Sequence, residues 1–145
     1  MDGRTCLNAV LELWQEISIK EEQWRGMDSI ARGITVSMEG DRVSGSKNQQ
    51  VMEMATVKMI DFENEINALK SKLIMLQNRI QTVVNRLGFS RLNLVISKRY
   101  LCFEDWEKIA EEMRITPRRA RQLHQQAVNE FAFQYRLVYG DDPDE

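Results

Sequence analysis

Arginine and glutamine side chains crowd a short stretch near the C-terminal end of the chain. An arginine guanidinium is a planar fork that can donate two hydrogen bonds to guanine O6 and N7 or to a phosphate, and a glutamine amide can pair with adenine in a similar two-point manner. These residue types therefore predict contacts to double-stranded DNA. The candidate DNA-binding residues are Thr116, Arg118, Arg119, Arg121, Gln122 and Gln125.

The stretch that carries these side chains has the signals of a helix start. Thr116 offers a hydroxyl cap, and Pro117 follows at the position where a missing N–H costs nothing. Small and apolar residues recur at helical spacing behind the arginines, so that they pack inward: Ala120, Leu123, Ala127 and Val128. We predict a helix over Thr116–Gln126 with the arginines and glutamines on or near its outer side.

A second short helix is expected just before it. Asp105 can cap its first turn, acidic residues near its start complement the helix dipole, and its apolar face consists of Trp106, Ile109, Ala110 and Met113. Arg114 and Ile115 leave only a brief connector. Two short helices so joined are typical of a helix-turn-helix unit, in which the second helix enters the DNA major groove. The unit would span about Phe103 to Val128, with Thr116–Gln126 as its recognition helix.

The three arginines also have a simpler interpretation, a solvated basic face paired with the acidic helix before it. The cap, the spacing and the small Ala120, which lets two helices approach closely, together favour DNA contact. The only histidine, His124, falls on the inward side next to Leu123. We interpret it as a structural histidine with satisfied hydrogen bonds rather than as a catalyst or ligand.

A seven-residue apolar repeat precedes this unit and predicts the element that carries it. From Met52 onward, two series of apolar residues alternate at steps of three and four, which places both on one stripe of a helix. The first series is Met52, Met59, Ile66, Leu73, Ile80 and Leu87, and the second is Ala55, Phe62, Leu69, Leu76 and Val83. We predict a long, coiled-coil-like helix that buries this stripe against another helix.

A partner for that helix lies upstream, over about Arg4 to Met38. Apolar residues recur there at three- and four-residue steps: Val10, Trp14, Ile17, Trp24, Met27, Ala31, Ile34 and Met38. Residues 39–49 are rich in Gly, Ser, Asp and Asn, which predicts a loop. The two segments are similar in length, so an antiparallel hairpin would match end to end. Residues 1–88 are therefore predicted to form a helical stalk.

Further apolar residues on the second helix lie off the main stripe: Ile60, Ile74, Met75 and Val84. They could widen the face that packs on the first helix, or they could meet a second copy of the chain. Of the two, we favour a homodimer that forms through the stalk.

The repeat is interrupted at Gly88, Phe89 and Ser90, where Ser90 can cap a new helix. The inward residues of that helix would be Leu92, Val95, Ile96 and Tyr100. We place a helix-turn-helix domain over residues 89–139 and an acidic tail over residues 140–145.

The composition is that of a folded, all-α protein of about one domain. Hydrophobic residues make up 43% of the 145, and only two are proline. Cys6 and Cys102 lack metal-ligand spacing and sit among apolar neighbours, which predicts buried, reduced thiols. No apolar run reaches secretory or membrane-spanning length, so we expect a cytoplasmic protein with no membrane contact. We expect neither cofactor nor metal, and no enzyme, because phosphate-loop, nucleophile-elbow and HExxH motifs are missing.

The C-terminal third resembles a known family. Arg99–Leu101, Trp106–Met113 and Thr116–His124 are similar to region 4 of bacterial sigma factors, which reads the promoter −35 element. A longer stretch, about Trp24 to Phe131, resembles small phage and prophage proteins of formerly unknown function. Such proteins are thought to regulate late-gene transcription, as the ArpU-type activators do. Phe103 and Arg114 stand where the family usually has glycine, and a non-glycine residue is disfavoured at positive φ.

The resemblance implies a DNA-bound regulator in a bacterial host, without the sigma domain that melts the −10 element. The stalk would dimerise the protein or dock it on RNA polymerase. Two other functions stay open. The helix-turn-helix domain over residues 89–139, which forms the head of the molecule, could bind RNA polymerase or a sigma factor without touching DNA. The chain could also be a packaging component like a small terminase subunit.

Overall fold

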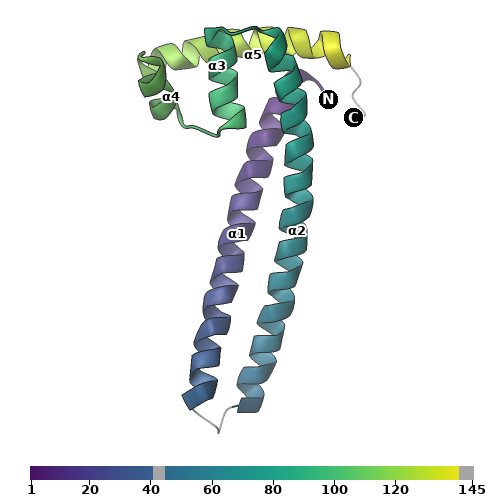
Figure 1. The fold of residues 1–145 in the computed structure, drawn as a ribbon, viewed down its shortest axis with the longest axis vertical. Coiled ribbons are helices and arrows are strands. Elements are labelled where there is room, and N and C mark those ends of the chain that lie inside the picture. Colours follow the sequence, from purple (N-terminus) through teal and green to yellow (C-terminus); the bar gives the residue numbers. More distant parts are fainter. Residues whose placement is uncertain (41–44, 141–145) are drawn as a thin grey trace. The chain divides into compact units, whose positions relative to one another are not determined.

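The computed structural model describes residues 1–40 and 45–140, with side chains described except over residues 35–46. All regular secondary structure in these residues is helical, which confirms the all-α class. The elements are α1 (Gly3–Gly40), α2 (Gly45–Arg86), α3 (Arg91–Ile96), the π-helical segment η1 (Ser97–Leu101), α4 (Trp106–Met113) and α5 (Pro117–Tyr139) (Figure 1). No helix among the described residues combines the length and the apolar character needed to cross a bilayer.

The long helices extend further than the sequence predicts. α1 reaches Gly40 and α2 begins at Gly45, so residues 45–49 of the expected loop are helical. Residues 41–44 lie outside the described part of the chain. Turn propensity is a weak signal beside a long helix, because each residue added to an existing helix gains a backbone hydrogen bond at little cost.

Contacts between residues divide the chain into two compact units, and both long helices contribute to each. Unit 2 covers Leu13–Lys72, and unit 1 combines Met1–Glu12 with Leu73–Glu145. The domain boundary expected at residue 88 stays a prediction.

In unit 2, α1 and α2 lie side by side (Figure 1). Leu13, Ile17, Ala55 and Ile66 are buried between them. Lys20 Nζ lies 2.7 Å from Glu65 Oε2, Lys70 Nζ lies 3.1 Å from Glu21 Oε1, and the Trp24 indole donates to Glu63 Oε1 at 3.0 Å. Exposed ion pairs of this kind add little stability. The apolar seam therefore supplies most of the stabilisation of this unit.

One inward assignment in α1 is wrong. Trp14, expected to pack inward, is exposed, and Leu13 is buried in its place. Steps of three or four residues from Val10 both lead to the same side of a helix, so the pattern cannot choose between neighbours. Leu13 and Ile17, four residues apart, occupy the seam.

Unit 1 has the larger core, to which the start of α1, the end of α2 and the second half of α5 contribute. Phe131 and Tyr135 of α5 are fully buried there, together with Cys6 of α1 and with Ile80 and Val84 of α2. The Arg79 guanidinium donates to the Tyr135 hydroxyl at 3.1 Å. Burial of the second half of α5 explains why this helix continues to Tyr139, well past the end at Gln126 that the sequence predicted. Val84 is a core residue, whereas Ile60, Ile74 and Met75 are exposed.

The break after α2 follows the sequence signals. Gly88 adopts a positive φ of 68°, and the Ser90 hydroxyl accepts a hydrogen bond from the Asn93 N–H, which confirms Ser90 as a cap. The Asn93 amide donates to the Val84 and Gly88 carbonyls at 3.2 and 2.7 Å, so it ties the start of α3 to the last turn of α2 and to the residue at the break.

The two thiols differ. Cys6 is buried, and burial raises its pKa to about 11. Cys102 is exposed, so its predicted burial is wrong. It ends the π-helical segment and caps it with its backbone N–H, and this leaves its side chain at the surface.

Candidate nucleic-acid interface

α4 forms as its sequence predicts. The Asp105 carboxylate accepts a hydrogen bond from the Lys108 N–H at 2.8 Å and caps the helix. Ile109 and Ala110 are buried on its inner face against Ala120 of α5. Half-buried apolar side chains surround this cluster: Trp106, Met113 and Ile115. The small Ala120 lies at the crossing of the two helices, as its side chain predicted.

The connection between α4 and α5 is tight and contains a strained residue. Arg114 adopts the left-handed conformation, with φ 59° and ψ 45°, and its N–H donates to the carbonyls of Ala110 and Glu111. The Ile115 N–H donates to the Ala110 carbonyl at 3.0 Å. Phe103, before α4, has a φ of 56°. Both turns thus have the positive φ that usually selects glycine, although each carries a larger residue.

α5 begins as expected. The Thr116 hydroxyl accepts a hydrogen bond from the Arg119 N–H at 3.1 Å, and Pro117 occupies the first helical position. Ala120, Leu123 and Ala127 are buried along its inner face. This packing fixes which side of the helix faces solvent.

All six candidate residues are exposed: Thr116, Arg118, Arg119, Arg121, Gln122 and Gln125. Arg118, Gln122 and Gln125 follow one another at steps of four and three, which places them on one stripe opposite the buried face. Arg119 and Arg121 flank this stripe, and Arg119 Nη1 lies 3.5 Å from Gln122 Oε1. Thr116 uses its hydroxyl as a helix cap, so its role here is to start the helix.

Electrostatics distinguish this face from an ordinary charged surface. The N-terminal end of a helix carries partial positive charge, so Arg118 and Arg119 in the first turn of α5 are unfavourable for the helix itself, and Arg121 adds a third positive charge in the next turn. Within the described residues, none of the three forms an ion pair with a carboxylate. The alternative in which they pair with the acidic α4 is therefore not observed. The structure leaves their guanidinium groups available to an external anion.

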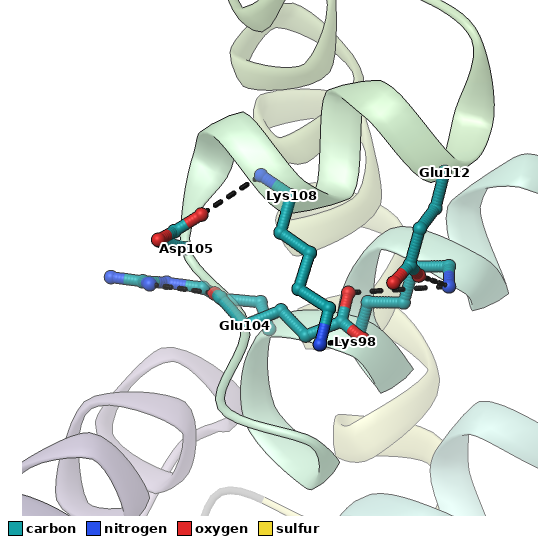
Figure 2. A network of polar contacts seen from close by, with 6 residues as sticks. Lys98, Glu104, Asp105, Lys108 and Glu112 are labelled. Atoms are coloured by element: carbon teal, nitrogen blue, oxygen red, sulfur yellow. Dashed lines mark hydrogen bonds and ion pairs between the residues drawn. The ribbon is translucent and has the colours of Figure 1, made fainter.

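The acidic residues beside α4 pair with lysines instead (Figure 2). The Lys98 ammonium of η1 donates a hydrogen bond to Glu112, and its Nζ lies 4.0 Å from Glu104 Oε2. The Lys108 ammonium lies 3.9 Å from Glu104 Oε1. The hydrogen bond raises the pKa of Lys98 and lowers that of Glu112. This network connects η1 to α4, and it pairs the Glu112 carboxylate with a lysine and not with an arginine of α5.

Sequence reasoning missed this network. Its members come from η1, from the segment before α4 and from α4 itself. In the sequence, their opposite charges are the only indication that they pair. The Arg99 guanidinium, which lies 5.1 Å from the centre of the Trp106 ring, donates to the Glu104 carbonyl at 3.0 Å. Through these two contacts, Arg99 also fixes the residues that lead into α4.

His124 is half-buried behind the interface. Its Nε2 lies 2.6 Å from the Tyr100 hydroxyl, and the Trp106 ring packs edge-on against it at 4.7 Å between centroids. Burial, aided by the nearby Arg99, lowers the pKa of His124 below 6.5. The expectation of a hydrogen-bonded structural histidine is confirmed.

Comparison with protein-family models, with curated proteins and with solved structures matched none of them to this chain. What the interface can bind follows from its own side chains and geometry.

Proposed function

We propose that this chain is a phage-type DNA-binding transcription regulator, in which α4 and α5 form a helix-turn-helix unit and α5 is the recognition helix. One observation carries the proposal: Arg118, Arg119 and Arg121 are exposed and without ion pairs among the described residues, on a helix start that disfavours cations. A protein surface that keeps such charges against local stability is typical of an anion-binding site.

The placement of the side chains suggests which of them contact base edges and which contact phosphates. In a helix-turn-helix complex, residues in the first turns of the second helix face base edges, while flanking residues contact the sugar-phosphate backbone. Arg118, Gln122 and Gln125 would face the major groove. Arg119 and Arg121, on either side, would contact phosphates.

The long helices would serve as a stalk in this proposal. α1 and α2 would form an antiparallel hairpin that dimerises the protein or docks it on RNA polymerase. The head would bind DNA upstream of late phage promoters in the cytoplasm of a bacterial host, as the resemblance to ArpU-type regulators implies. The protein would act by binding, without catalysis.

Charge removal tests the interface. The double substitution Arg118→Gln and Arg121→Gln should weaken binding to duplex DNA by at least about tenfold at moderate salt. The reason is that each phosphate contact that is lost leaves about one counterion on the DNA instead of releasing it. The slope of log affinity against log salt should fall by about two. Fluorescence anisotropy with labelled duplexes at several salt concentrations measures both quantities.

A matched control removes the same charge elsewhere. Arg25→Gln with Arg32→Gln changes two exposed arginines of α1 in unit 2 and should leave affinity and slope nearly unchanged. If the α5 variant bound DNA as tightly as the unchanged chain, the proposed function would be wrong.

A second candidate function rests on a different observation. Phe133 and Leu137, four residues apart on α5, are 57% and 58% exposed, and together they offer an apolar strip. Such a strip favours a protein partner, for example RNA polymerase or a sigma factor. Binding through it would respond weakly to salt, whereas binding through phosphate contacts would fall steeply.

A further inference from the structure

A shallow pocket lies in unit 1, where the first turn of α1 meets the second half of α5. Two guanidinium groups border it, from Arg4 of α1 and Arg136 of α5, and Asn129 lies on the same rim. Asp2 is the one carboxylate in the lining. Its Oδ1 accepts a hydrogen bond from the Thr5 N–H at 2.7 Å, so it is engaged as the cap of α1.

Close packing fixes the position of Arg4. A Cβ atom on Gly3 would lie 2.9 Å from the Cα of Ala132, so only glycine lets the first turn of α1 approach α5 this closely. Next to it, the Arg4 guanidinium donates a hydrogen bond to Asn129 Oδ1. Arginine has five N–H donors, and the one bond to Asn129 leaves others for a ligand.

The pocket also continues the candidate DNA-binding face. Arg118, Gln122, Gln125 and Asn129 follow one another at steps of four, three and four, and all four are exposed. At about 1.5 Å per residue this stripe is about 16 Å long, whereas the major groove is about 12 Å wide. In a helix that crosses the groove, the Asn129 end of the stripe would reach the sugar-phosphate backbone while the Arg118 end faced base edges.

We propose that Arg4, Asn129 and Arg136, which line this pocket, bind one backbone phosphate of the DNA duplex that α5 contacts. This inference rests on the proposed function, because it requires DNA on the outer face of α5. Arginine suits the role, since its planar fork matches two phosphate oxygens. The start of α1 thus adds a DNA contact from the opposite end of the chain.

Two substitutions in this pocket have opposite expected effects. Arg4→Gln should weaken binding to a short duplex of mixed sequence several-fold and lower the salt slope by about one, equally for unrelated sequences. Asp2→Asn keeps a good helix cap but removes the carboxylate, so it should tighten binding. Arg25→Gln, an equal charge change on α1 in unit 2, is the control. Thermal melting followed by circular dichroism shows whether each variant is folded.

The outcomes separate this inference from the function it rests on. If the double variant of Arg118 and Arg121 weakens binding while Arg4→Gln and Asp2→Asn behave like the control, the phosphate site is wrong and the recognition helix stands. If the unchanged chain fails to bind the duplex, or if no α5 variant weakens it, both proposals fall. A loss with Arg4→Gln and a gain with Asp2→Asn support the site.

Discussion

Arg118 and Arg119 are unfavourable at the positions that they occupy. A cation in the first turn of a helix loses about 0.3–1 kcal/mol against the helix dipole. The inner face of α5 offsets this cost, because Ala120, Leu123 and Ala127 are buried along it. Stability therefore comes from one face of the helix, and the opposite face is free to serve another purpose.

His124 makes the stability of the head depend on pH. Burial lowers its pKa below 6.5, so the unfolded chain binds a proton more readily than the folded chain. Stability should be full above about pH 6.5, the unfolded value, and should be lost progressively as the pH falls through it. Urea midpoints measured between about pH 7 and pH 5 should therefore decrease.

The chain has no other histidine, and the pKa values of Asp2 and Glu112 lie below their usual range, which confines their titration to stronger acid. His124→Gln should flatten the decrease between pH 7 and pH 5. An equally steep decrease in that variant would show that another group is responsible.

Single-residue outcomes were predictable where the local signal was strong. The Thr116 and Asp105 caps and the outward position of the arginines followed from residue type and spacing. The exposure of Cys102 and the Lys98–Glu104–Glu112 network did not, because both depend on how the π-helical segment turns toward α4. The spacing of apolar and polar residues does not predict the direction in which this segment leads into α4.

At the scale of elements, the turn between α4 and α5 determines where the recognition helix points. Arg114 holds a left-handed conformation that costs a non-glycine residue about 1–2 kcal/mol. Arg114→Gly removes this cost, but glycine also gives the unfolded chain more conformational entropy, which lowers the stability of the folded state by about 0.4–1 kcal/mol. The variant should therefore be more stable by about 0.8 kcal/mol, and by at most about 1.6 kcal/mol, in urea unfolding.

Arg114→Ala is the matched comparison, since it also removes the guanidinium but keeps the strain. The glycine variant should exceed the alanine variant in stability. Equal stabilities would mean that the left-handed conformation at residue 114 is not strained.

The lengths of the elements were harder to predict than their existence. The stop expected at Gln126 was wrong because the apolar spacing that sustains α5 continues with Phe131 and Tyr135, whose burial depends on the distant start of α1. Gly3 and Ala132, which pack closely, lie near opposite ends of the sequence, so no local sequence pattern predicts their contact.

At the scale of the whole molecule, the exposed apolar residues of α2 bear on the proposed homodimer. Val51, Met54, Val57 and Ile60 are 42%, 69%, 59% and 49% exposed. Helix-turn-helix proteins commonly bind paired half-sites as dimers. Sedimentation equilibrium should therefore give twice the chain mass of 17.0 kDa.

Met54→Glu with Val57→Glu should raise the dimer dissociation constant by at least about tenfold, because two carboxylates of like charge are costly to bury at an apolar interface. Ser71→Lys, an exposed position of α2 away from these residues, should have no effect. A monomer at all concentrations would contradict dimerisation, and a ring of many copies would favour a packaging component.

The central claim is that the start of α5 reads bases in the major groove. The most direct test selects a preferred site from a random duplex pool and then maps protection of guanine N7, a major-groove atom, from methylation by dimethyl sulfate. We expect protected guanines in the selected site, and loss of that protection with Arg118→Gln, which removes the arginine placed in the major groove. Failure to select any site, or guanine N7 atoms that stay fully reactive in the bound complex, would contradict it.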